Sequence, residues 1–323
     1  MIVDNFALSI YQSCPSKYDL RIIQQWTTRR KSAALGFGGA FHLGLAEWYK
    51  TGSRQEMLKA IQEGWPDGMP VDDFRSKAKC VEALIAYTKE YPAENFTVVD
   101  GPDGKLIEVS FTLPTGLYLP LCYHVDENGI ISGCGNDARM DRSWDPTIGA
   151  CPNCGLPLED LQYGGIFDGL VEFSGALYVF EHKTTSRLGD RFFDQFRPNN
   201  QVSGYVWGAS KLSGKQIGGA LINAIGIYKS SPTKFKRQVT MRAPEEINEW
   251  LGSVYNTCVS IQQAKVTGSF PMHTGSCTMY GRCEYHAVHS LPYAKQRLAI
   301  LEQDYQLSEW NHEARDEDST EDE

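Results

Sequence analysis

Two apolar, β-prone stretches with a short polar break between them stand out in the middle of the chain. The break is Ser174-Gly175, and the stretches on either side are rich in aromatic and β-branched residues. This pattern predicts a β-hairpin over residues 164–184 with a tight turn. A turn centred on the break pairs residues that are equally far from it, so Asp168 is expected opposite Glu181.

The rest of the chain alternates between helical and extended patterns. Helices are expected within the ranges 5–30, 40–49, 54–64, 74–91, 198–212 and 244–266, with a last helix ending near residue 307. The glycine-rich residues 36–39 are expected to lead into the second of these helices. Extended segments are expected at 96–100, 106–112, 217–228 and 236–241. Strands interleaved with helices indicate a mixed α/β fold, with one domain over residues 1–308 and an acidic, disordered tail over 309–323.

Charged residues on the hairpin point to chemistry. Two carboxylates directly across a ladder, Asp168 and Glu181, repel each other unless a cation lies between them. Lys183 shares a face with Glu181 because side chains alternate along a strand. A divalent metal with a lysine beside it is typical of a phosphodiester hydrolase. The alternative is a solvated, charged hairpin face, but the apolar neighbours favour a buried strand, where unpaired acids are costly.

Composition and charge narrow the class of protein. The chain has 323 residues, 41% of them hydrophobic, and no apolar run of about 20 residues that could span a bilayer. The N-terminus lacks a signal-peptide pattern, so we expect a cytoplasmic protein without membrane contact and without a disulfide framework. Net charge is −9, of which residues 313–323 contribute −6 (seven acids and one arginine). Basic clusters at 29–31 and 234–237 leave a local phosphate-binding surface open.

Four cysteines fall in a turn-rich segment, 117–163, that has few core residues. Cys151-Pro-Asn-Cys154-Gly is a knuckle typical of zinc ribbons, because its turn aims both sulfurs at one ion. Cys134, followed by glycine, is expected to start the opposing half, with Cys122 or His124 as the fourth ligand. A loop with scattered thiols is the alternative, but so small an insertion needs a staple to stay folded.

The order of polar residues along the chain resembles one family. The matching positions are His42, Glu108, Gly165-x-x-Asp168, Glu181-x-Lys183-Thr184 and Gln201-x-x-x-Tyr205. This order is similar to the RecB-like branch of the PD-(D/E)xK nucleases, which includes the AddB-type and CRISPR-adaptation-type exonucleases of bacteria and phages. The resemblance spans most of the chain, from Ser13 to Cys283. It departs from the family's motif at Phe167, which stands where a proline precedes the acid.

The resemblance implies a restriction-endonuclease-like core and a role for each matching residue. Asp168 and Glu181 would bind Mg²⁺ or Mn²⁺. His42 would complete the metal shell, and Glu108 would be a further metal ligand or a support. The catalytic role of Lys183 would be to orient the attacking water and stabilise charge on the phosphate. The Gln201 and Tyr205 pair would position the substrate strand, and the alternative is that both lie on an ordinary amphipathic helix. For His42 the alternative is a histidine packed against the sheet without a metal.

The resemblance also implies a substrate, partners and a location. It implies DNA cleavage, from a single-stranded or free end, in recombination, repair or replication within a bacterial cell or a phage-infected host. A rival interpretation is a non-catalytic DNA-binding or recombination-accessory protein that keeps the fold. Another is an interaction protein whose ribbon and acidic tail recruit a helicase or recombinase.

Cysteines near the two ends of the chain form a further candidate site. Iron–sulfur members of the branch hold a [4Fe–4S] cluster with one N-terminal and three C-terminal cysteines, and Cys14, Cys277 and Cys283 match that placement. No fourth cysteine follows, so His289 is the candidate for the last ligand. Three alternatives stay open: a Cys₃His cluster, a zinc ion in its place, or buried thiols without metal. The remaining cysteines, Cys80 and Cys258, lie in helical patterns and are expected in the core.

Overall fold

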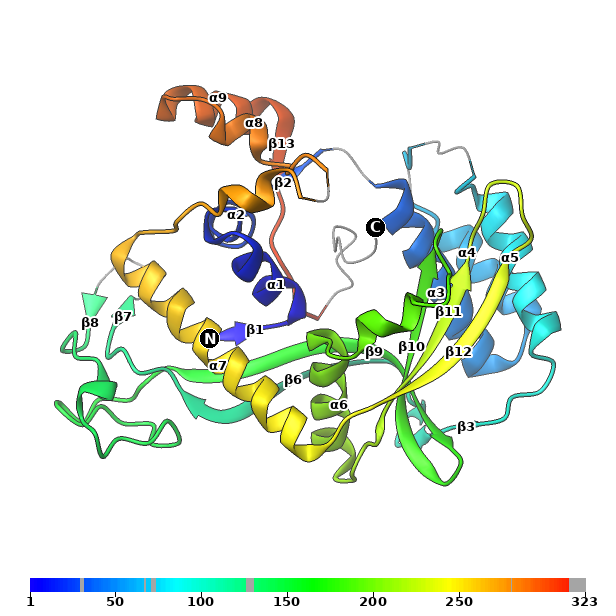
Figure 1. Cartoon of the computed structure of the whole chain (residues 1–323), viewed down its shortest axis with the longest axis horizontal. Coiled ribbons are helices and arrows are strands. Elements are labelled where there is room, and N and C mark those ends of the chain that lie inside the picture. Colours follow the sequence, from blue (N-terminus) through cyan, green and yellow to red (C-terminus); the bar gives the residue numbers. More distant parts are fainter. Residues whose placement is uncertain (30–31, 67, 71–73, 126–130, 280, 314–323) are drawn as a thin grey trace. The chain divides into compact units, whose positions relative to one another are not determined.

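The computed structural model describes residues 1–29, 32–66, 68–70, 74–125, 131–279 and 281–313 (Figure 1). Its contacts divide the chain into two compact units. Unit 1 comprises Met1–Arg29, Thr112–Gly164 and Asn248–His312, and unit 2 comprises Arg30–Phe111, Gly165–Ile247 and the C-terminal residues 313–323. Strand β9 (Asp160–Phe173) runs through both units. The single domain over residues 1–308 stays a prediction.

Unit 2 is built on a mixed β-sheet, as the sequence predicts. The second part of β9 pairs with β10 (Ala176–Thr185), which is followed by β11 (Gly219–Gly226) and β12 (Lys234–Met241). β10 and β11 are parallel, whereas β9–β10 and β11–β12 are antiparallel. β3 (Thr97–Val98) and β6 (Ile107–Tyr118) also pair with β9, and β4 (Asp100–Gly101) and β5 (Gly104–Lys105) form a small hairpin.

The central hairpin has the predicted register. Paired positions run from Phe173 and Ala176 to Gly169 and Phe180, one position short of Asp168 and Glu181. Both turn residues have positive φ, 51° at the serine and 78° at the glycine of the Ser-Gly turn. Positive φ at both central positions defines a type I′ turn, whose twist matches the strands.

Three helices pack on one face of this sheet: α3 (Ala33–Thr51), α4 (Arg54–Gly64) and α5 (Lys77–Glu90). A serine caps each N-terminus by accepting a backbone hydrogen bond. The expectation that residues 36–39 only lead into a helix is wrong, because the Ser32 cap starts α3 earlier. Glycine is needed inside α3 at Gly44, where a Cβ would lie 2.6 Å from Leu84 Cδ1 of α5.

Helix α6 (Asn200–Ser213) lies on the opposite face and follows the 3₁₀ turn η3 (Phe192–Phe196). Its N-cap is Asn199, whose Oδ1 accepts from the Val202 N–H at 3.0 Å. Gly208 lets α6 approach the sheet closely, because a Cβ there would lie 2.4 Å from the Phe111 ring. The predicted helix at 198–212 is thus confirmed.

Unit 1 holds most of the cysteines. Its N-terminal elements are β1 (Ile2–Val3), α1 (Asn5–Ser13), α2 (Pro15–Tyr18), the π-helical turn η1 (Asp19–Ile23) and β2 (Trp26–Thr28). Its middle segment carries β7 (His124–Val125), β8 (Ile131–Ser132) and η2 (Ala138–Met140). Its C-terminal elements are α7 (Pro244–Thr267, which begins in unit 2), η4 (Thr274–Cys277), α8 (His286–His289), α9 (Ala294–Asp304) and β13 (Tyr305–Leu307).

The C-terminal helix is shorter than expected. It ends at Asp304, and the chain continues as β13, which pairs with β2. The cause is Tyr305, whose ring stacks on Tyr285 at 5.4 Å between centroids and whose hydroxyl donates to the Glu284 carbonyl. Further on, Trp310 Nε1 donates to Asp4 Oδ2 at 3.3 Å. Residues 314–323, most of the predicted tail, lie outside the described residues.

No helix among the described residues has both the length and the apolar character needed to cross a bilayer.

Candidate active site

Three of the predicted site residues in unit 2 converge. His42 on α3, Glu108 on β6 and Asp168 on β9 each offer a ligand atom, and these atoms all lie within 4.8 Å of one another. His42 Nδ1 lies 3.0 Å from Asp168 Oδ1. Asp168 is 1% exposed, so its carboxylate is buried beside an imidazole and a second acid. A buried acid beside a second, partly buried acid is stabilised by a positive charge between them.

The donor set fits a divalent metal ion. Ligands at about 2.1 Å around an octahedral ion are roughly 3.0 Å apart when adjacent and 4.2 Å when opposite. The 3.0 Å between His42 Nδ1 and Asp168 Oδ1 matches the spacing of adjacent ligands. Carboxylates suit Mg²⁺ and Mn²⁺, and the imidazole favours Mn²⁺ of the two.

Glu181 and Lys183 form a pair next to this group. Glu181 Oε1 lies 3.6 Å from Lys183 Nζ, and both side chains are largely buried. The backbone after Glu181 contacts Asp168 directly, since the His182 N–H donates to Asp168 Oδ2 at 2.6 Å. Lys183 is the next residue after His182, whose N–H binds the Asp168 carboxylate. Glu181 itself is outside the 4.8 Å group among the described residues.

A buried polar network supports the site from the α3 face. Asn223 Nδ2 donates to His182 Nδ1 at 2.9 Å, and Asn223 Oδ1 accepts from Arg237 Nε at 3.1 Å. Arg237 in turn pairs with Glu94. Burial alone would lower the pKa of Arg237, but Glu94 and the neighbouring tyrosines raise it above its ordinary value. The His182 ring also packs edge-on to His42, 5.6 Å between centroids. Sequence reasoning missed this network, because its members are far apart in the chain.

Helix α6 places Tyr205, one of the two residues predicted to contact substrate, beside β9, the strand that carries Asp168. Tyr205 packs on Phe167, the residue before Asp168, with 6.5 Å between ring centroids. A Cβ on Gly165 would lie 3.1 Å from the Tyr205 ring, so glycine permits this approach. Gln201 lies in the first turn of α6, and its contact with substrate stays a prediction.

The four cysteines of residues 117–163 gather in unit 1, as predicted. All four sulfurs lie within 4.8 Å of one another, with Cys122 3.5 Å from Cys154 and Cys134 3.6 Å from Cys151. Tetrahedral zinc with Zn–S bonds of about 2.3 Å sets sulfurs about 3.8 Å apart, whereas a disulfide needs about 2.05 Å. The donor set therefore fits one zinc ion. Cys122 takes the fourth position; the side chain of the alternative, His124, lies outside the described residues.

Acidity favours the same assignment at one cysteine. Hydrogen bonding from the Asn153 side chain lowers the pKa of Cys134 to about 6, whereas burial raises the pKa of Cys122 to about 12. The thiolate is the form that binds metal.

The proposed clasp residues lie where the N-terminal helices meet the loop before α8. Cys14 Sγ accepts from the His273 N–H at 3.4 Å, and Ser16 Oγ lies 3.0 Å from His289 Nε2. The Cys283 N–H donates to the Cys277 carbonyl at 2.9 Å. Within the described residues these four ligand atoms do not form a group within 4.8 Å. Since a cluster spaces its thiolates more widely than a single ion, the [4Fe–4S] alternative stays a prediction.

The comparisons with known proteins bear on this geometry. A family model, that of the PD-(D/E)XK nuclease superfamily, matches residues 6–288. No curated protein matches the chain. A crystal structure of a candidate exonuclease from Eubacterium rectale is 13% identical, with 90% of this chain and 91% of that chain covered and a TM-score of 0.45. The crystal structure of SSO0001 is 10% identical over 67% and 72% of the two chains, with a TM-score of 0.23.

Proposed function

Since the chain belongs to the PD-(D/E)XK nuclease superfamily, we propose that it is a metal-dependent deoxyribonuclease of the RecB-like branch. The observation that carries the proposal is the group of His42, Glu108 and Asp168 beside the Glu181–Lys183 pair. Carboxylates, an imidazole and a lysine form a set that can bind a cation and stabilise a phosphate.

Each residue has a chemical task in this proposal. The ion, Mg²⁺ or Mn²⁺, supplies Lewis acidity at the phosphodiester. His42, Glu108 and Asp168 would hold it, with Glu181, which lies beside Lys183, as the further ligand that the resemblance implies. Lys183 donates hydrogen bonds that position the attacking water and balance negative charge on the phosphate oxygens. The low exposure of Lys183 and Glu181, 12% and 4%, strengthens these interactions by excluding water.

We further propose single-stranded DNA with a free end as the substrate, processed in recombination, repair or replication in the bacterial or phage-infected cytoplasm. The QxxxY arrangement of Gln201 and Tyr205 supports this choice by resemblance to the exonucleolytic branch. Two metal centres complete the proposal. One is structural zinc on Cys122, Cys134, Cys151 and Cys154. The other is a clasp, [4Fe–4S] or zinc, on Cys14, Cys277, Cys283 and His289.

The test is cleavage of end-labelled DNA. We expect nucleotides to be released from linear single strands with Mn²⁺ or Mg²⁺, and a circular single strand to resist if a free end is needed. The Asp168→Ala/Lys183→Ala double variant should lose at least 1,000-fold in rate (about 4 kcal/mol). Asp103→Ala, which removes an exposed acid of the β4–β5 turn, is the control. Full activity of the double variant would refute the site, and DNA retention without turnover would favour the non-catalytic alternative.

A further inference from the structure

A cavity of about 400 Å³ opens in unit 2 between η3 and the β11–β12 strands. Phe193, Phe196, Arg197, Ile222, Gln238 and Thr240 line it. Its size falls in the range of small-molecule sites, which are mostly apolar with a few placed polar groups. None of these residues has a role in the active site described above.

The cavity lies on the face of the sheet that carries Glu181. Glu181 on β10 is in register with Ile222 on β11, which is in register with Gln238 on β12. Residues in register on neighbouring strands point to the same face, so Gln238 and Glu181 share one. Two strand spacings separate them, or roughly 10 Å. When a DNA strand is bound beside Glu181, a neighbouring nucleotide of that strand can therefore reach the cavity.

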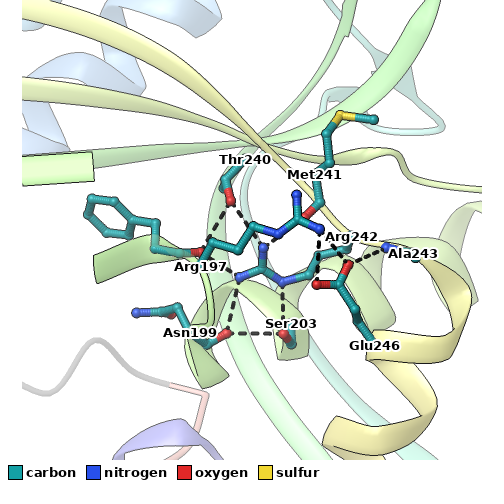
Figure 2. Close-up of polar contacts among 9 residues, drawn as sticks. Arg197, Asn199, Ser203, Thr240, Met241, Arg242, Ala243 and Glu246 are labelled. Atoms are coloured by element: carbon teal, nitrogen blue, oxygen red, sulfur yellow. Dashed lines mark hydrogen bonds and ion pairs between the residues drawn. The ribbon is translucent and has the colours of Figure 1, made fainter. Parts of the chain in front are cut away.

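Arg242 bonds to two residues of the cavity lining, Phe196 and Thr240 (Figure 2). Its guanidinium, 5% exposed, donates to the Phe196 carbonyl at 2.6 Å and to the Ser203 hydroxyl at 3.0 Å. It also donates to Thr240 Oγ1 at 3.0 Å and to the Asn199 carbonyl at 3.4 Å. These bonds tie η3 and the first turn of α6 to β12. The cavity is therefore formed before any ligand arrives, which lowers the cost of binding.

Arg197 differs from Arg242 in being available to a ligand. The Arg197 side chain is 55% exposed, and it forms an ion pair with Glu246 at 3.2 Å (Figure 2). Glu246 also accepts from the Ala243 N–H at 2.7 Å, and this bond lowers the pKa of the carboxyl. An exposed arginine–carboxylate pair is weak, so a phosphate can compete for the guanidinium.

We propose that this cavity is a subsite for one nucleotide of the single-stranded DNA, next to the nucleotide whose phosphodiester is cut. The base lies against the Phe193 and Phe196 wall, and Gln238 bonds to its edge with an amide that can donate or accept. The phosphate lies on Arg197, whose positive charge offsets that of Asp194, another residue of the lining. Aromatic stacking with a nearby cation is how proteins bind single strands without sequence preference. The inference rests on the proposed function.

Two variants with opposite expected effects test the subsite. Arg197→Gln should raise KM for single-stranded DNA about tenfold with kcat within twofold, and reduce the slope of log K against log salt by about 1. Glu246→Gln keeps the bond to Ala243 but releases Arg197, so KM should fall. Damage to the fold would change both variants in the same direction. Gln238→Ala, at an exposed position, should raise KM about threefold. Lys89→Gln, an exposed charge at the end of α5, is the control.

A binding readout separates the subsite from the nuclease itself. In the Asp168→Ala background with Ca²⁺, 2-aminopurine placed at successive positions of an oligonucleotide should change emission at one position. Phe193→Leu or Gln238→Ala should reduce that change. The subsite is overturned if Arg197→Gln and Glu246→Gln match Lys89→Gln in salt slope, or if no single position responds. Absence of cleavage in every metal would count against the proposed function instead, because DNA binding is measured without it.

Discussion

Glu108 has a φ of 55°, in the left-handed region that residues with a Cβ rarely adopt. Strand β6 accepts this conformation at the one residue that brings a carboxylate to His42 and Asp168. Backbone strain of this kind clusters at functional sites, where the fold imposes it. Sequence periodicity predicted the strand and placed Glu108 on the face away from Ile107. It could not predict the backbone angle, because φ at a single residue leaves no mark on the hydrophobic pattern.

Removing this strain should separate stability from activity. Glu108→Gly should stabilise the metal-free protein by about 1 kcal/mol relative to Glu108→Gln, because both lose the charge but only glycine relaxes φ. Both should lose at least 100-fold in cleavage rate. Denaturant unfolding in EDTA and cleavage assays measure the two effects. Ser174→Gly, at φ 51°, is the control and should stabilise without loss of activity. Equal stability of the glycine and glutamine variants at position 108 would contradict the strain argument.

Cys80 gives a second prediction at the residue scale. It is fully buried on α5, as the sequence predicted, and burial raises the pKa of its thiol to about 12 from 9. The unfolded chain therefore releases this proton first as pH rises. The contribution of the buried Cys80 thiol to the free energy of unfolding is therefore complete below pH 9 and is lost progressively between pH 9 and 12. One such group contributes a slope of about 1.4 kcal/mol per pH unit in that window. Urea midpoints of Cys80→Ala should fall less steeply from pH 9 to 11 than those of the unaltered chain; identical slopes would exclude the effect.

At the scale of elements, the site depends on a polar layer between α3, α5 and the sheet. Arg237 on β12 and Glu94 after α5 pair in this layer with Tyr49 and Tyr87, whose hydroxyls lie 2.6 Å apart. Arg237→Met should cost about 3 kcal/mol, because it leaves the partly buried Glu94 charge, 19% exposed, with only the Tyr49 hydroxyl as its partner. Equilibrium unfolding measures this loss.

The double variant Glu94→Leu/Arg237→Met is the matched control for that loss. It should recover most of the stability, since an apolar pair needs no charge balance. Its cleavage rate should nevertheless stay below that of the unaltered chain, because Asn223 loses the arginine that orients it toward His182. Recovery of the full cleavage rate would show that the layer serves stability alone.

The elements themselves were largely predictable, and their contacts were not. The hairpin register followed from the Ser174-Gly175 break, and α6 from its periodicity, because local patterns determine both. The position of α6 depends on Gly165 and Gly208, whose close contacts with Tyr205 and Phe111 join segments far apart in sequence. The same holds for Arg242, which reads as one basic residue after a strand. Its hydrogen bonds to Phe196 and Asn199 exist only once β12 and η3 lie together.

At the scale of the whole molecule, the proposed metal sites divide by unit. The Mg²⁺ or Mn²⁺ group lies in unit 2, whereas both sets of cysteines proposed as ligands lie in unit 1. Cys122 and Cys151 are also part of a small buried cluster with Ala138 and Leu158. So small a core cannot stabilise the insertion unaided, so bound zinc should supply much of its folding energy.

Metal content should therefore respond to cysteine variants one site at a time. Cys154→Ser should reduce the zinc content by one ion per chain and lower the midpoint for unfolding of unit 1. Cys283→Ser should leave zinc in place and abolish iron, together with the visible absorption of anaerobically purified protein, if the clasp holds a cluster. Cys80→Ala, outside both sets, should change neither metal. A zinc content in Cys154→Ser equal to that of the unaltered chain would refute the four-cysteine site, since a tetrahedral ion cannot keep its affinity with one of four thiolates replaced by a hydroxyl.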